Sequence, residues 1–225
     1  MSIEFDVLES HEPKDLAHKL LYYAREAKQS LLLVSGEMYV LAQAPEIANK
    51  FWSELDRKVS ENGKFELNVI TGEAVFWTGA EECALLDLFQ KSRQKFREYE
   101  KFNYFITKAD QPEIHGVVVD GEEVCLEAPH RSPKSKRYVG CKRDKELAQA
   151  FRYLAFVKPI IEGKTIHIMR ETKLKIYKSV DEWSRGRGEE IGRTEYDISE
   201  NQVYDLLSRK AQDIRQEYRN ALSQG

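Results

Sequence analysis

One hairpin signal constrains the fold of this chain more than any other feature of its sequence. Val117-Val118-Val119 is a β-branched run, Asp120-Gly121 is a turn dipeptide, and Val124-Cys125-Leu126 restarts the apolar pattern. β-Branched residues favour strands, and Asp-Gly between two apolar runs favours a two-residue hairpin turn. We therefore predict two antiparallel strands, with the polar residues that flank them between positions 113 and 130 at the strand ends.

Helical and strand patterns alternate through the rest of residues 1–162. Apolar residues at helical spacing predict helices at Pro13–Gln29, Pro45–Glu61, Glu81–Tyr99 and Asp144–Val157. Short apolar runs predict strands at Ser30–Gly36, Phe65–Gly72 and Phe102–Thr107. This alternation predicts an α/β domain over residues 1–162, with a layered mixed sheet flanked by helices.

A small C-terminal α+β extension is predicted for residues 163–225. Two short strand patterns, at 165–169 and 173–177, precede a charged helix over Ser199–Leu222. Ser199 and Gln202 have the spacing of a capping box at the start of this helix. Composition leaves open whether the extension packs on the main domain or forms an interface with a partner.

The charge balance gives no global reason to expect nucleic-acid binding, because 35 Lys and Arg residues stand against 38 Asp and Glu residues. No apolar run approaches the roughly 20 residues that span a bilayer, and the acidic N-terminus lacks the order of a secretion signal. We therefore expect a cytoplasmic protein with no membrane segment and no cofactor. The three widely spaced cysteines, Cys83, Cys125 and Cys141, predict free thiols in a reducing compartment.

Histidines and carboxylates around the predicted hairpin are the candidates for chemistry. The candidate catalytic residues are His115, Asp120, Glu127 and His130. With Glu122 they also offer the nitrogen and oxygen ligands that Zn²⁺ or Mn²⁺ accepts, but no His-Glu-x-x-His motif supports a metal site and we assign none. The solvated ends of an ordinary hairpin account for the same residues, so a catalytic role, a metal site and a structural role stay open.

A basic segment follows the predicted hairpin. Residues 131–145 hold seven cations and one acid in fifteen positions. Such a segment can wrap phosphate oxygens, and a tyrosine within it can stack on a base, so an anionic ligand or a nucleic acid is the expected partner. A solvated surface loop is the alternative. The candidate ligand-binding residues are Glu113, Arg131, Lys134, Lys136, Arg137 and Tyr138.

The order of these elements resembles one half of the phospholipase D superfamily over residues 10–160. A helix, a strand ending in Ser35-Gly36-Glu37, a second helix and a strand ending in Thr71-Gly72-Glu73 precede the strand that enters Asp120-Gly121. The motif of that family is His-x-Lys-x-x-x-x-Asp, usually followed by Gly. With Asp120-Gly121 on its Asp-Gly, Glu113 stands in place of the nucleophilic histidine and His115 in place of the lysine.

The resemblance therefore implies a phospholipase D-like fold with a degenerate motif, in which only Asp120 is retained. A histidine mechanism needs a nucleophilic imidazole and cationic support for the phosphate oxygens, and Glu113 would repel a phosphodiester. We predict a non-catalytic protein that binds an anionic ligand, with a regulatory role. A phosphodiesterase or nuclease that uses His115 with carboxylates or a metal is the second hypothesis, and assembly through the C-terminal helix is the third. Single-motif members of the family build their site from two chains, which implies a homodimer.

Overall fold

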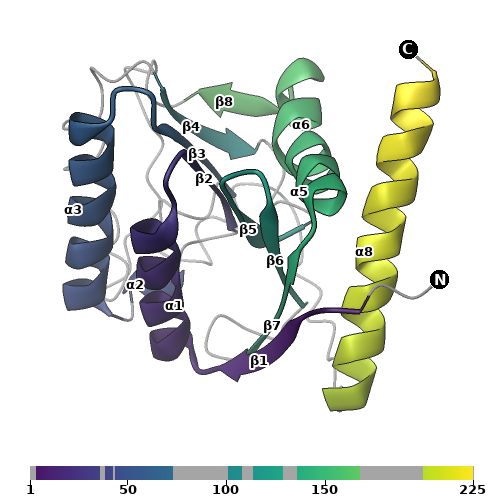
Figure 1. Cartoon of the computed structure of the whole chain (residues 1–225), viewed down its shortest axis with the longest axis horizontal. Helices are drawn as coiled ribbons and strands as arrows, with labels where there is room; N and C mark the ends of the chain where they lie inside the picture. The colour runs from purple at the N-terminus through teal and green to yellow at the C-terminus, as the bar shows by residue number, and fades with distance from the viewer. Residues whose placement is uncertain are drawn as a thin grey trace, which may run out of the picture.

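Eight strands in the described part of the chain form one mixed sheet with helices on both faces (Figure 1). The structure is a computed structural model that describes residues 4–35, 39–42, 44–72, 101–107, 114–128, 136–167 and 200–224. The strands are β1 (Val7–His11), β2 (Ser30–Ser35), β3 (Glu66–Thr71), β4 (Phe102–Thr107), β5 (Gly116–Val119), β6 (Glu123–Glu127), β7 (Arg137–Arg143) and β8 (Thr165–His167). Their order across the sheet is β1-β7-β6-β5-β2-β3-β4-β8.

The centre of the sheet is parallel and both flanks are antiparallel. β2 pairs in parallel with β3, and β3 pairs in parallel with β4. β5 joins β2 antiparallel and continues through the predicted hairpin into β6, followed in the sheet by β7 and β1. The predicted α/β class with a layered mixed sheet is therefore confirmed.

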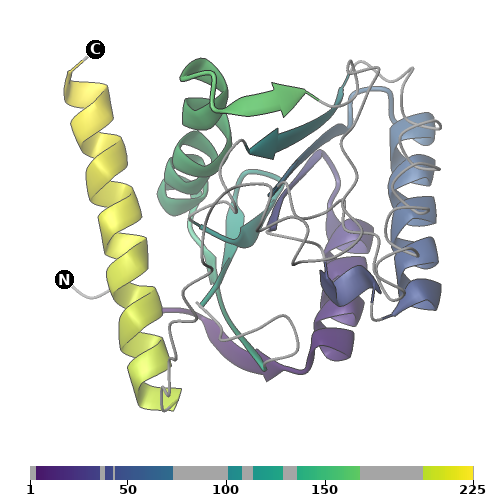
Figure 2. The same cartoon turned by 180° about the vertical axis from the view of Figure 1, so that it is seen from behind.

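Helices cover the sheet in two layers on opposite faces (Figures 1 and 2). The elements are α1 (Pro13–Glu26), α2 (Tyr39–Ala42), α3 (Pro45–Glu61), α5 (Lys145–Arg152), a π-helical turn η2 (Tyr153–Val157), α6 (Lys158–Ile161) and α8 (Glu200–Ser223). The buried residues of α1, α2 and α3 form one core with one face of the sheet, and those of α5, η2 and α8 form a second core with the other. The apolar runs of β2 and β3 are buried because they lie between these two cores.

Local chemistry explains the starts of three helices and the change of helix type after Arg152. Proline stands in the first turn of α1 and of α3, where the missing N–H has no partner to lose. Asp144 caps α5 by accepting a hydrogen bond of 3.0 Å from the N–H of Leu147. The helix predicted at Asp144–Val157 changes to a π-helical turn after Arg152. Pro159 cannot donate to the preceding turn, which fits a widened turn at this place.

The C-terminal segment contributes to the sheet and to the second core. β8 pairs antiparallel with β4 at the edge of the sheet. The apolar stripe of α8 is buried in the second core at Val203, Leu207, Ala211 and Ile214. Figure 2 shows α8 beside the layer of α5 and α6. Of the two roles that composition left open for this segment, the structure shows packing on the main domain.

Several predicted segments lie outside the described residues: the helix at Glu81–Tyr99, the strand at 173–177 and the Ser199 capping position. Among the helices of the described ranges, none has the length and apolar character to cross a membrane.

The prediction of free thiols is wrong for two of the three cysteines. Cys125 on β6 and Cys141 on β7 are directly opposite each other in the antiparallel ladder, with their Cα atoms 4.1 Å apart, and they form a disulfide. Because the prediction rested on spacing along the chain, it could not recognise two cysteines 16 positions apart that strand pairing brings together.

Candidate functional site

Polar side chains gather at the edge of the sheet where the parallel strands end. Ser35 at the end of β2 pairs with Thr71 at the end of β3, and Val34 is opposite Gly116 at the start of β5. His115 therefore lies at the carboxyl edge of the parallel strands. In open α/β sheets this edge is where ligands bind.

Four polar residues lie on neighbouring strands or directly beside them at this edge, and we call them the polar row: His115, Glu127, Arg137 and His11. The N–H of Glu127 donates to the carbonyl of His115 over 3.0 Å, and His11 is the register partner of Arg137. Cys125 and Val139 face the core of α1 and α3, so strand alternation places Glu127 and Arg137 on that same face. At about 4.8 Å per strand, the row spans roughly 14 Å.

An ion pair of low exposure forms the centre of the polar row. The Nη1 atom of Arg137 is 3.1 Å from Oε1 of Glu127, and the two side chains are 4% and 17% exposed. A guanidinium that is removed from water requires a close carboxylate, because an uncompensated buried charge is very costly. Arg137 was predicted as a ligand-binding cation, whereas the structure places its charge against Glu127.

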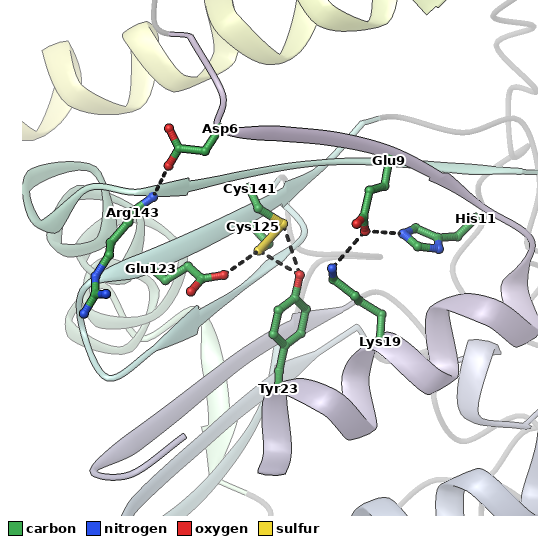
Figure 3. The surroundings of a disulfide bond; sticks show 9 residues. All are labelled: Asp6, Glu9, His11, Lys19, Tyr23, Glu123, Cys125, Cys141 and Arg143. Atoms are coloured by element: carbon green, nitrogen blue, oxygen red, sulfur yellow. Dashed lines mark hydrogen bonds and ion pairs between the residues drawn. A yellow bond between two sulfur atoms is a disulfide. The ribbon is translucent and has the colours of Figure 1, made fainter. Parts of the chain in front are cut away.

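A second ionic group lies beside the row on β1 and α1 (Figure 3). The carboxylate of Glu9 is 2.9 Å from the Nζ of Lys19 and 2.9 Å from the Nε2 of His11. The hydrogen bond from Lys19 holds the pKa of Glu9 below its ordinary value, against the opposing effect of partial burial and with help from His11. Glu9 stays ionised and fixes the two basic side chains at the end of the row.

Asp120 lies at the other edge of the sheet, separated from His115 by the whole length of β5. Its backbone has a φ of 54° in the hairpin turn, as the Asp-Gly signal predicts. Its carboxylate accepts the N–H groups of Lys28, Gln29 and Ser30 at 2.7–3.0 Å. The four residues predicted as catalytic therefore do not all come together, because a strand separates two of them, and Asp120 has a structural partner set.

The described part of the predicted basic segment is strand β7 and the start of α5, not a surface loop. Arg137 pairs with Glu127, Lys142 with Asp6, and Arg143 with Glu122. Strand alternation sends successive cations to opposite faces of the sheet, so they do not form one surface. Of the acids that balance them, Glu127 is on β6, Glu122 lies in the turn before β6, and Asp6 directly precedes β1.

The remaining predicted residues are divided between faces and ranges. Lys136 is exposed just before β7. Tyr138 is half-buried against the second core, on the face of β7 opposite Arg137, so a base stacked there would be separated from the polar row by the sheet. Glu113, His130, Arg131 and Lys134 lie outside the described residues.

The metal alternative has no support within the described ranges, where no three His, Cys, Asp or Glu residues gather closely enough to hold an ion. The polar row offers an imidazole at each end and a neutralised ion pair between them. Such an arrangement can donate hydrogen bonds to an anion, and it can orient a ligand across four strands.

The sequence analysis missed His11, Glu9 and Lys19 because β1 is a five-residue strand with weak apolar alternation.

Comparisons with known proteins find similarity only at the level of structure. The sequence matches no protein-family model and no curated protein. A phosphatidylserine synthase from Haemophilus influenzae Rd KW20 aligns with a TM-score of 0.51 and 14% identity, covering 96% of this chain and 45% of that one. TrmBL2, an archaeal chromatin protein described with a novel mode of DNA binding, aligns with a TM-score of 0.48 and 13% identity, covering 73% of this chain and 54% of that one. NucT from Helicobacter pylori aligns with a TM-score of 0.43 and 12% identity, covering 73% of this chain and 99% of that one. This chain thus spans about half the length of the synthase and of TrmBL2.

Proposed function

We propose that this chain, which has the phospholipase D-like fold of the synthase, binds a phosphate-bearing or nucleic-acid ligand at the polar row and does not cleave it. The fold agrees with the resemblance read from the sequence. The observation that carries the proposal is the polar row itself, because it places ionic and imidazole groups at the edge where this class of sheet binds ligands.

The loss of the family motif supports binding without cleavage. Glu113 replaces the nucleophilic histidine in the sequence, and His115 replaces the lysine that would neutralise phosphate oxygens. The retained Asp120 binds three backbone N–H groups at the opposite edge. A phosphoryl-transfer site needs a nucleophile and positive charge at the same point.

We assign contact with the ligand to His115 in the polar row and to the exposed Lys136 beside it. His130, Arg131 and Lys134 follow the hairpin directly in the sequence and belong to the same proposal on that ground. Tyr138, on the other face of the sheet, and the negatively charged Glu113 are left out of it. Glu127 and Arg137 act by positioning, because their charges neutralise each other and hold the ends of β6 and β7 together. This division predicts that ligand affinity depends on the exposed cations, while removal of Arg137 mainly affects stability.

The test compares two variants of equal net charge. Arg131→Gln/Lys134→Gln/Lys136→Gln removes three cations from the segment that precedes β7 in the sequence, and Lys14→Gln/Lys50→Gln/Lys64→Gln removes three exposed cations elsewhere. Binding of a fluorescein-labelled 20-nucleotide single strand, and of its duplex, is followed by anisotropy at two salt concentrations. We expect at least a tenfold loss of affinity in the first variant and less than threefold in the second, because phosphate contacts act locally. Equal losses in the two variants would refute the location of the site.

Catalysis is tested on the same preparations. Wild-type protein and His115→Ala are incubated with the labelled strands and with a chromogenic phosphodiester, with and without a chelator. We expect intact substrates in every case. Cleavage that His115→Ala abolishes in a folded protein would replace the binding proposal with the phosphodiesterase hypothesis.

The homodimer and the cytoplasmic location stay predictions, and sedimentation of the full chain tests the first of them.

A further inference from the structure

The disulfide between Cys125 and Cys141 is built into the sheet between α1 and the edge strand β1 (Figure 3). The two cysteines are register partners on β6 and β7, so the ladder keeps the sulfurs adjacent whether or not they are bonded. Opening the bond therefore requires no rearrangement of these two strands.

Tyr23 of α1 points its hydroxyl at both sulfurs. The Oη atom is 2.9 Å from Sγ of Cys125 and 3.1 Å from Sγ of Cys141. Burial raises the pKa of Tyr23, and the negative charge of Glu123 raises it further, so the hydroxyl keeps its proton. It is therefore a hydrogen-bond donor to whichever sulfur carries negative charge during exchange.

A carboxylate completes the surroundings of Cys125. Oε1 of Glu123 is 3.9 Å from Sγ of Cys125, a distance at which a thiol, but not a disulfide sulfur, donates to the oxygen. The bonded sulfurs thus have Tyr23 as a partner, and the reduced Cys125 gains Glu123 as another. Both redox states of the pair are accommodated by groups already in place.

The sulfurs are shielded from solvent in the folded chain. Cys125 is 1% exposed and Cys141 is 6% exposed, so a reductant reaches them only after a local opening. β1 is the edge strand that pairs with β7, and Val7 is the register partner of Cys141. Two contacts hold this strand. Glu9 forms an ion pair with Lys19, and the backbone N–H of Arg143 donates a hydrogen bond of 2.9 Å to Asp6, the residue before β1. Short edge strands are among the first elements to open.

We propose that the Cys125–Cys141 disulfide is a thiol–disulfide exchange site for a small dithiol. Opening of β1 exposes the disulfide, and Tyr23 assists the exchange as a hydrogen-bond donor. A thiolate of the dithiol attacks Sγ of Cys141, the less buried sulfur, and the bond to Cys125 breaks. Cys125 leaves as a thiolate that Tyr23 stabilises and then takes a proton from solvent. The second thiol of the reagent attacks the mixed disulfide, releases Cys141 and closes the oxidised reagent. Two electrons and two protons pass from the dithiol to the protein.

The experiment uses the full chain with Cys83→Ser, so that the pair is the only source of thiols. Protein purified without reductant is treated with dithiothreitol, quenched in acid, unfolded and labelled with a maleimide, and the labels are counted by mass spectrometry. We expect no label before treatment and two labels per chain after it. Two labels on the untreated protein would overturn the proposal.

Variants of β1 test the route of access. Glu9→Gln and Asp6→Asn each remove an anchor of β1 and should raise the initial rate of reduction about twofold to fivefold. Glu54→Gln removes a comparable ion pair with Arg57 on α3 and should leave the rate unchanged. Equal rates in the wild type and in both β1 variants would exclude opening of β1 as the route.

Tyr23→Phe tests the role of the hydroxyl. It removes the donor while keeping the ring in the core, and it should slow reduction several-fold in a protein of unchanged circular dichroism. A rate equal to that of the wild type would refute the assignment of Tyr23 as the assisting donor. The reverse reaction, followed as loss of label after removal of the dithiol and addition of its oxidised form, should be slowed in the same variant, because both directions pass through the same transition state.

Discussion

Replacement of Asp120 distinguishes a structural aspartate from a catalytic one. Its carboxylate accepts three backbone N–H groups, two exposed at Lys28 and Gln29 and one partly buried at Ser30. With about 0.5–1 kcal/mol for each bond, and about 1 kcal/mol for placing alanine at a positive φ, Asp120→Ala should cost roughly 3 kcal/mol. For a chain of this length that loss lowers the Tm by about 6–12 °C.

The measurement is thermal unfolding monitored by circular dichroism, and two further variants serve as comparisons. Asp120→Asn keeps one oxygen acceptor and the tolerance for positive φ, so its Tm should fall by roughly half as much. Glu122→Ala is in the same turn and loses only an exposed pair with Arg143, so its Tm should stay within about 1 °C of the wild type. A Tm of Asp120→Ala equal to that of Glu122→Ala would refute the reasoning.

Three other predictions follow from buried or packed groups. Burial alone would raise the pKa of Asp144, but the N–H of Leu147 and the guanidinium of Arg215 outweigh it and hold that pKa below 3.8. Its stabilising contribution is therefore present above pH 3.8 and lost as the pH falls through the folded-state pKa, so urea unfolding should show Asp144→Asn destabilised at pH 7 and progressively less so in acid. Glu127→Ala removes the carboxylate that lies 3.1 Å from the buried Arg137 and should cost about 3 kcal/mol by urea unfolding, and a cost under about 1 kcal/mol would contradict the ion pair. Gly116→Ala places a Cβ against the carbonyl oxygen of Cys125 and should cost about 1–3 kcal/mol, whereas Gly63→Ala has open space around the Cβ and should be close to neutral.

Local signals were sufficient for much of the fold. The hairpin turn at Asp120-Gly121, the helix start at Pro45 and the buried strand Ser30–Ser35 follow from preferences that act over a few residues. The strand β7 was not recognised because cations at Arg137 and Lys142 obscure its alternation. Those cations are tolerated in a strand because Glu127 on β6 and Asp6 before β1 neutralise them.

The candidate site was predictable only in part. The sequence shows that His115 and Glu127 flank the hairpin. In the structure both residues lie at the edge where the parallel strands end. Asp120 lies at the opposite edge because the whole of β5 separates it from His115. The addition of His11 and Lys19 to this edge depends on β1, which pairs with a strand about 130 positions later in the chain.

The sequence by itself determined the α/β class and the hairpin, because periodicity and turn chemistry are written in neighbouring residues. The tertiary structure alone decided which charges are neutralised and which cysteines are bonded. Glu127 meets Arg137, and Cys125 meets Cys141, through the register of β6 against β7. Pairing between strands converts separation along the chain into contact in space, and no local pattern encodes that contact.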